Sequence, residues 1–222
     1  MNESVKAQGM SIKAKSDAAF LLIAAYNDLD PESSAYNADI FDVDYIRDQK
    51  DTEASAAKST DTLFPVAHST ITKTSEADTI TNWYFAYSDD PEDAFGTYTE
   101  STLVHKPIAD GQFSKYVLKN QFGIALADGS AAVSNLRVSA AAISPSSSSA
   151  VKVLVTTSTA AEEFPRAASA TPVTLASSVP ANDYVMVNVY IYWDGNEDVV
   201  FTNNFENLVE TSVTLTFTAD IA

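Results

Sequence analysis

The stretch of the chain that decides its fold is residues 184–193, with the sequence YVMVNVYIYW. Every second residue from Val185 to Trp193 is apolar, and a period of two residues is that of a β-strand, whose side chains point alternately to opposite faces. The intervening positions include Tyr190 and Tyr192, so large side chains occupy both faces. A strand covered on both faces lies inside a layered fold, and this segment therefore predicts the centre of a β-sheet.

The same alternation recurs along the chain. Residues 211–221 alternate Ser, Thr or Asp with an apolar set that should share one face: Val213, Leu215, Phe217, Ala219 and Ile221. In residues 116–126, another shared face is expected: Tyr116, Leu118, Phe122, Ile124 and Leu126, interrupted by Asn120. Shorter strands are predicted within residues 20–26, 83–87, 136–140 and 151–155.

Turn residues separate these segments. Asp128-Gly129 and Asp194-Gly195 are typical tight-turn sequences, and helical patterns are scarce. The polar, Ala- and Ser-rich residues 48–61 are expected to form a surface excursion or a short helix. The sequence therefore predicts an all-β fold, a jelly-roll-like or Ig-like β-sandwich with few short helices.

No domain boundary and no internal repeat stands out. We expect a single β-sandwich domain over residues 1–222, in which the weakly patterned residues 27–78 are a candidate insertion.

Composition excludes several classes of function. The 222 residues include 13 Lys and Arg against 30 Asp and Glu, which gives a formal net charge of -17. Such an acidic surface repels nucleic acid and anionic lipid, so neither partner is expected. No apolar run approaches the ~20 residues of a membrane helix, so the chain is not expected to insert in a membrane.

The residues of common active sites are also missing. The chain has no Cys, and its two histidines, His68 and His105, stand in no HExxH or HxH pattern. A GxSxG elbow and Gly-rich phosphate loops are absent. Carboxylate pairs suited to a glycosidase arise by chance among 30 acids, and the aromatic stripes are more typical of a core than of a sugar platform. We expect a protein that is not an enzyme and requires no cofactor.

Two acidic turns could bind calcium, which prefers six to eight oxygen ligands from carboxylates, amides and carbonyls. Neither turn has the spacing of an EF-hand loop, and a solvated acidic loop is the alternative interpretation. The candidate metal ligands are Asp89, Asp90, Glu92, Asp93, Asp194, Asn196 and Asp198.

Strand patterns at both ends of the chain indicate a second kind of site. A terminal strand can be donated to a neighbouring copy, where it adds a ladder of hydrogen bonds to the acceptor. Head-to-tail donation does not close, so it generates a filament. We favour residues 1–15 as donor. Gly9 is expected to form a β-bulge where the alternation of apolar residues changes phase. The donor residues are Val5, Ala7, Gly9, Met10, Ile12 and Ala14. The alternative is that both terminal strands pair within their own subunit.

The opening sequence NESVKAQGMSIKAK resembles the mature start of secreted, fibre-forming surface proteins of the TasA/camelysin-like group, which a SipW-type signal peptidase processes. Residues 116–126, 135–139, 187–198 and 211–217 look like the sandwich strands of such chains, whereas residues 27–110 depart from them. The resemblance implies a jelly-roll-like sandwich, donor-strand polymerisation and a matrix or pilus role. The metallopeptidase activity attributed to camelysin-like members is not carried over, because HExxH is absent.

We therefore expect a structural subunit of an extracellular filament, a pilus or biofilm-matrix fibre, whose partners are copies of itself. Its expected location is the cell surface, after removal of a signal peptide that this sequence does not contain. The alternatives are a monomeric adhesin or carbohydrate-binding sandwich with calcium loops, and a phage or virion structural protein.

Overall fold

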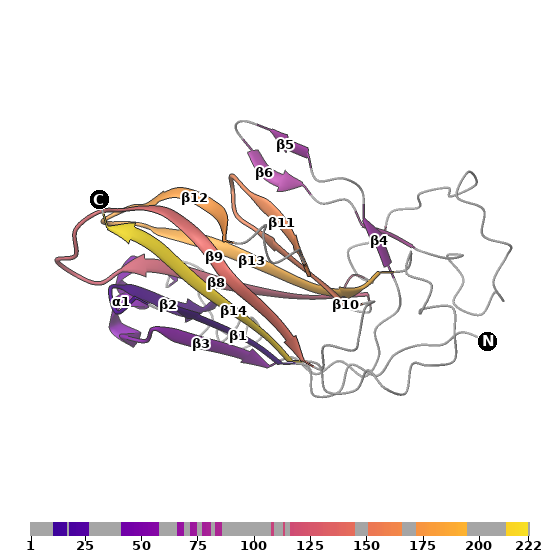
Figure 1. Cartoon of the computed structure of the whole chain (residues 1–222), viewed down its shortest axis with the longest axis horizontal. Coiled ribbons are helices and arrows are strands. Elements are labelled where there is room, and N and C mark those ends of the chain that lie inside the picture. Colours follow the sequence, from indigo (N-terminus) through magenta and orange to yellow (C-terminus); the bar gives the residue numbers. More distant parts are fainter. Residues whose placement is uncertain are drawn as a thin grey trace, which may run out of the picture.

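A computed structural model of the chain describes residues 11–16, 18–26, 41–57, 66–68, 72–74, 77–80, 83–85, 108, 113, 116–144, 151–165, 172–194 and 212–221. Within these residues the fold is a β-sandwich of two five-stranded sheets with one short helix, as the sequence predicts (Figure 1).

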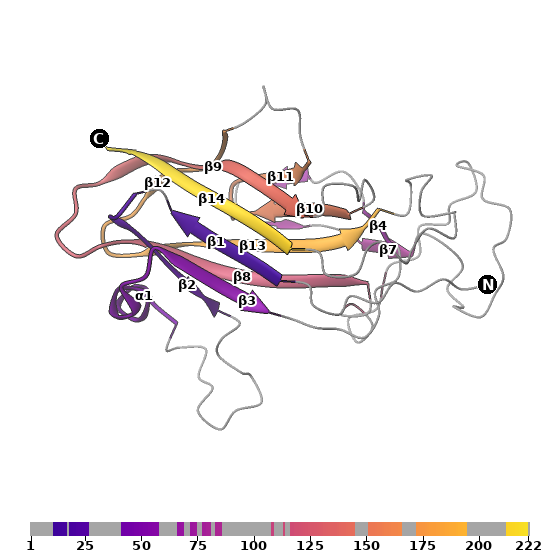
Figure 2. The ribbon, with the colours of Figure 1, turned by 60° about the horizontal axis from the view of Figure 1, so that its bottom comes forward.

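The first sheet joins strands from both ends of the chain. Its order is β12 (Val173–Val179), β9 (Val133–Ser144), β14 (Ser212–Ile221), β1 (Ser11–Ser16) and β3 (Glu53–Ala57). Figure 2 shows β1 lying between β14 and β3. The pairing of β1 with β14 is the only parallel ladder among the described strands, and the other ladders are antiparallel.

The second sheet carries the predicted central strand. Its order is β11 (Ala161–Phe164), β10 (Val151–Thr156), β13 (Tyr184–Trp193), β8 (Val117–Leu126) and β2 (Leu21–Ala25). Two small ladders complete the described strands: β4 (Val66–His68) with β7 (Trp83–Phe85), and β5 (Thr72–Thr74) with β6 (Ala77–Ile80).

The inner faces of the two sheets enclose one apolar core. Alternating residues supply it, and fully buried aromatic side chains from four strands are among the largest in it: Phe122, Phe164, Trp193 and Phe217. Burial of each such side chain stabilises the folded chain by roughly 1.5–3 kcal/mol. Because both sheets contribute to the same core, strands distant in sequence are held in one unit.

Both sides of β13 are covered, as expected for a central strand. Its outward Tyr192 is fully buried beneath Trp83 of β7, with ring centroids 4.9 Å apart. Tyr192 also donates a hydrogen bond to Glu163, and burial is the main cause that raises the pKa of its hydroxyl.

The sandwich is closed at both of its long sides by bonds between the sheets. On one side, Thr157 Oγ1 donates to the carbonyl of Leu175 in β12 at 2.6 Å. On the other, the amide of Ile23 in β2 donates to the carbonyl of Asp51, just before β3, at 2.8 Å. Such closures satisfy edge groups that would otherwise attract other strands.

Three details of the sequence-based prediction are wrong. The described part of residues 48–61, residues 48–57, forms no separate excursion or helix: the helix α1 (Val43–Gln49) ends at its start and β3 follows. Tyr116 packs with Val117 in the outer aromatic cluster, not on the inner face of β8. Ile221, the last residue of β14, is 71% exposed, although its partner Val133 on β9 is buried.

Candidate functional site

The predicted donor strand lies in a position that we call the β1 slot, the space between β14 and β3 that β1 fills. In the register of the first sheet, Ile12 is flanked by Val213 and Ala56, and Ala14 by Leu215 and Ala54. β1 thus holds together two strands that come from distant parts of the chain.

The inner face of β1 belongs to the core. Ile12 is 2% exposed and Ala14 is fully buried. The two residues point inward because they alternate along the strand with Lys13 and Lys15. A side chain as large as that of Ile12 leaves a cavity when removed, so the slot needs an occupant for the sandwich to be stable.

The outer face of β1 is basic in an otherwise acidic protein. Lys13 lies opposite Ser55 on one side and Thr214 on the other. Its Nζ atom is 2.7 Å from a carboxylate oxygen of Glu53, with side-chain exposures of 40% and 57%. Solvent screens a pair this exposed, so the ion pair orients β1 more than it stabilises the fold.

A short connection links the slot to the second sheet. The amide of Ser16 donates to the carbonyl of Thr52 at 2.8 Å, which closes the last pair of the β1–β3 ladder. Two residues later, the amide of Ala18 donates to Ser16 Oγ, and its carbonyl accepts from the amide of Leu21, where β2 begins. These bonds link the end of β1 to the start of β2.

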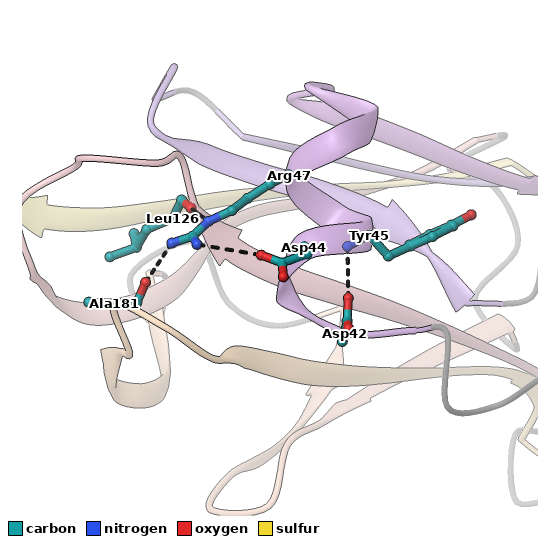
Figure 3. Close-up of polar contacts among 6 residues, drawn as sticks. All are labelled: Asp42, Asp44, Tyr45, Arg47, Leu126 and Ala181. Atoms are coloured by element: carbon teal, nitrogen blue, oxygen red, sulfur yellow. Dashed lines mark hydrogen bonds and ion pairs between the residues drawn. The ribbon is translucent and has the colours of Figure 1, made fainter.

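The helix α1 packs on the second sheet, against β2 and β8. Its N-cap is Asp42, whose carboxylate accepts a hydrogen bond of 2.8 Å from the amide of Tyr45. Figure 3 shows Arg47 reaching from the helix to two carbonyl oxygens: its Nε donates to Leu126 at 3.0 Å and its Nη2 to Ala181 at 2.6 Å. Arg47 thus ties α1 to the end of β8 and to the turn that precedes β13.

Gly123 of β8 lies directly beneath the helix. A Cβ atom at this position would be 2.6 Å from Ile46 Cδ1 and 2.7 Å from the ring of Phe41. Ile46 is fully buried and Phe41 is 4% exposed, so neither has room to move away. The glycine is required by the close approach of α1 to the sheet.

A polar cluster holds the last residues of β14. Asp220 accepts hydrogen bonds from both terminal nitrogens of Arg137, and from Asn135 Nδ2 at 3.0 Å. The bonds from Arg137 are the largest cause that lowers the pKa of the Asp220 carboxyl below its ordinary value. This cluster fixes β14, one wall of the slot, against β9.

The predicted donor residues are only partly covered by the described structure. Ile12 and Ala14 lie in the β1 slot and face the core, as the alternation predicts. The remaining predicted donor residues fall outside the described residues: Val5, Ala7, Gly9 and Met10.

The predicted calcium turns are mostly outside the described structure as well. Asp194 is described; it is partly buried and forms an isolated bridge with Val66. The other candidate ligands lie outside the described residues: Asp89, Asp90, Glu92, Asp93, Asn196 and Asp198. Within the described ranges, no three His, Asp or Glu side chains gather in a way that could hold a metal ion. Calcium binding stays a prediction.

A sugar-binding platform on the outer face of β13 is not supported by the described residues. Trp83 packs against both Tyr190 and Tyr192, with ring centroids 5.7 and 4.9 Å apart. Tyr192 is fully buried and Tyr190 is partly buried beside Phe113. These aromatic side chains therefore form a second, outer core.

Comparisons with protein-family models, with curated proteins and with solved structures find no match to this chain. Among the helices formed by the described residues, none has the length and apolar character needed to cross a membrane. The class defined by the fold is a β-sandwich in which the first of the described strands, β1, pairs with the last of them, β14.

Proposed function

We propose that this protein is a structural subunit of an extracellular filament, a pilus or biofilm-matrix fibre, in which β1 of one copy fills the β1 slot of the next. The observation that carries the proposal is the position of β1 between β14 and β3. A neighbour's β1 could make the same ladders and bury the same Ile12 and Ala14 as the chain's own strand does. The exchange therefore conserves the contacts of the strand, and its costs are the opening of the turn before β2 and the lost translational and rotational freedom of the associating copies.

The arrangement of the sheet favours β1 as the exchanged element. β14 is paired on its other side with β9 over nearly its whole length, so departure of β1 leaves that wall intact. Among the described strands β1 is the first, and the turn at Ala18 joins it to β2, so this turn is the described connection that must open for exchange.

Charge supports the same assignment. Residues 1–15 contain three lysines and one glutamate, a formal charge of +2, while the chain as a whole carries -17. A basic donor segment is attracted to the acidic body of a neighbouring copy, and Glu53 in the slot wall is a local partner for Lys13.

Engineered disulfides test the exchange directly, since the chain has no cysteine of its own. Lys13 and Ser55 face each other across β1 and β3. They form a non-hydrogen-bonded pair, the closer type, because Ser16 and Thr52 three positions away form a hydrogen-bonded pair. In the variant Lys13→Cys/Ser55→Cys, oxidised filaments should yield a ladder of covalent multimers on a non-reducing gel.

The control is a pair that exchange cannot separate. Ala142→Cys/Thr214→Cys joins outward positions of β9 and β14, both of which stay in the body, so it should give only disulfides within one chain. Fibres in which Lys13→Cys/Ser55→Cys links only within single chains would overturn β1 as donor. Absence of fibres in negative-stain images at high protein concentration would overturn the filament function.

The second candidate function is a monomeric cell-surface binding module. The observation that favours it is that β1 fills its own slot in the single chain. Such a protein stays monomeric on sizing and binds glycans or other surface ligands, so the same gel and images separate the two candidates.

A further inference from the structure

The wall of the β1 slot formed by β3 depends on β1 itself. β3 is the edge strand of the first sheet, and β1 is its only ladder partner among the described strands. When β1 leaves, β3 loses every hydrogen bond of that ladder. A slot with two walls therefore requires another contact that holds β3 in place.

The chain just before β3 is bonded to the second sheet. α1 ends at Gln49, and Lys50 follows in the left-handed conformation with φ 54°, its amide bonded to the carbonyl of Arg47. Asp51 then accepts the 2.8 Å hydrogen bond from Ile23 of β2, and β3 begins at Glu53. Only three residues separate α1 from β3, so the position of the helix limits the position of the strand.

Arg47 fixes the helix. Its guanidinium donates to carbonyls on two other segments, Leu126 and Ala181, whereas its contact with Asp44 is a distant 3.9 Å. Hydrogen bonds from a charged donor are stronger than neutral ones, and the fork of the guanidinium sets their direction. Its side chain is only 18% exposed, so water replaces these bonds poorly.

The surface beneath the helix does not involve β1. α1 packs its buried Ile46 on Gly123 of β8 and lies with Phe41 over Leu22 and Ala24 of β2. These contacts belong to the outer face of the second sheet, and β1 is a strand of the first. They remain in place whether the β1 slot is filled or empty.

We infer that α1, fixed by Arg47 and seated on Gly123, holds β3 as the second wall of the slot while β1 is exchanged between copies. The inference rests on the proposed function and deepens it. Arg47 is a positioning residue. It does not touch the incoming strand, but it determines whether that strand can pair with both β14 and β3 or with β14 alone.

Two cysteine pairs distinguish the walls in the full-length chain. Lys13→Cys/Ser55→Cys reports the pairing of an incoming β1 with β3, and Lys13→Cys/Thr214→Cys reports its pairing with β14. Each pair is placed in the wild-type background and with Arg47→Ala, Arg47→Lys or Gly123→Ala. Lys119→Ala, which removes one positive charge from β8 away from the helix, is the matched control.

In Arg47→Ala and Gly123→Ala chains, the disulfides between copies at 13/55 should fall at least about fivefold relative to those at 13/214. The first variant removes two hydrogen bonds, each worth roughly that ratio, and the second forces the helix away from the sheet. Arg47→Lys should be intermediate, since an ammonium replaces the charge but not the fork. Lys119→Ala should leave the ratio unchanged.

Equal loss at both positions would overturn the inference, because it would indicate general destabilisation and not the loss of one wall. An unchanged ratio would overturn it as well. Failure of the proposed function looks different: neither pair would then link separate copies, even in the wild-type background.

Discussion

At position 123 the absence of a side chain sets how closely α1 approaches the second sheet. The nearest atoms that a Cβ would meet belong to Ile46 and Phe41, both in a buried cluster that includes Ala125. Gly129 contrasts with it: its φ is +72° in an exposed turn, and nothing lies within 4 Å of a Cβ built there. One glycine is required by space, the other by backbone conformation.

We expect Gly123→Ala to lower the free energy of unfolding by about 1–3 kcal/mol, because the added methyl group overpacks a site with no room. Urea denaturation followed by fluorescence measures this change. Gly129→Asn is the control and should change stability by less than about 0.5 kcal/mol, since Asn tolerates a positive φ. A neutral Gly123→Ala would mean that α1 can shift on the sheet.

Sequence reasoning finds some of these residues and misses others for a physical reason. Asp128-Gly129 identifies its own turn, because a positive φ is a local requirement. Arg47 is separated by 79 residues from one of its acceptors and by 134 from the other, and both acceptors are backbone carbonyls. Nothing in the side chains of Leu126 or Ala181 signals such a contact.

Among the elements, β14 is attached to β9 by a polar cluster at its last residues in addition to its ladder. Arg137 and Asn135 bind the Asp220 carboxylate, and this lowers the pKa of Asp220 in the folded chain below its ordinary value of 3.8. A carboxyl with a lowered folded-state pKa stabilises the fold fully above its ordinary pKa. That contribution is lost as the pH falls through the lowered value.

Asp220→Asn should therefore be less stable than the wild type at neutral pH. The difference in stability should shrink at pH values below 3.8, the ordinary pKa of this carboxyl, which it has in the unfolded chain. Urea denaturation at several pH values measures it. A double-mutant cycle with Arg137→Gln isolates the pair, and its coupling should fade over the same acidic range. A coupling that does not change with pH would assign the effect to packing.

Elements with strict alternation follow from the sequence, and those with interrupted or weak patterns do not. β10, β13 and β14 bury their predicted apolar faces because each strand contacts the core along most of its length. β9 is 12 residues long, longer than predicted. A register shift opposite Thr216 and Phe217 changes which residues of β9 face inward, and this interrupts the alternation on which the prediction depends. β3, with the sequence EASAA, has no apolar signal at all, since its place comes from β1 and α1.

Over the whole molecule, acidity opposes association. Every copy carries a formal charge of -17, and the lysines of β1 offset only a small part of it. Repulsion between copies acts over the Debye length, which is about 30 Å at 0.01 M salt and about 3 Å at 1 M. The charge of the body thus opposes the assembly that we propose to occur by exchange of β1.

Filament formation should be slow at about 0.01 M salt and much faster at about 1 M, because screening removes the long-range repulsion while the buried contacts of β1 are unaffected. Pelleting with negative-stain counting of fibres measures the rates. Lys13→Gln is the control for the local ion pair with Glu53, and it should leave the direction of the salt effect unchanged. Faster assembly at low salt would mean that attraction by the basic segment dominates.

The parallel ladder between β1 and β14 has a consequence for any fibre built by exchange. Because each incoming β1 enters its host's slot in the one direction parallel to β14, every interface along the fibre is the same and successive subunits repeat head to tail. The two tips of the fibre are then chemically unlike: one offers an empty groove, and the other an unplaced strand. A synthetic peptide with the sequence SIKAKS should stop growth only at the tip with the empty groove. Growth at the tip with the unplaced strand should continue until the free subunits in solution are used up.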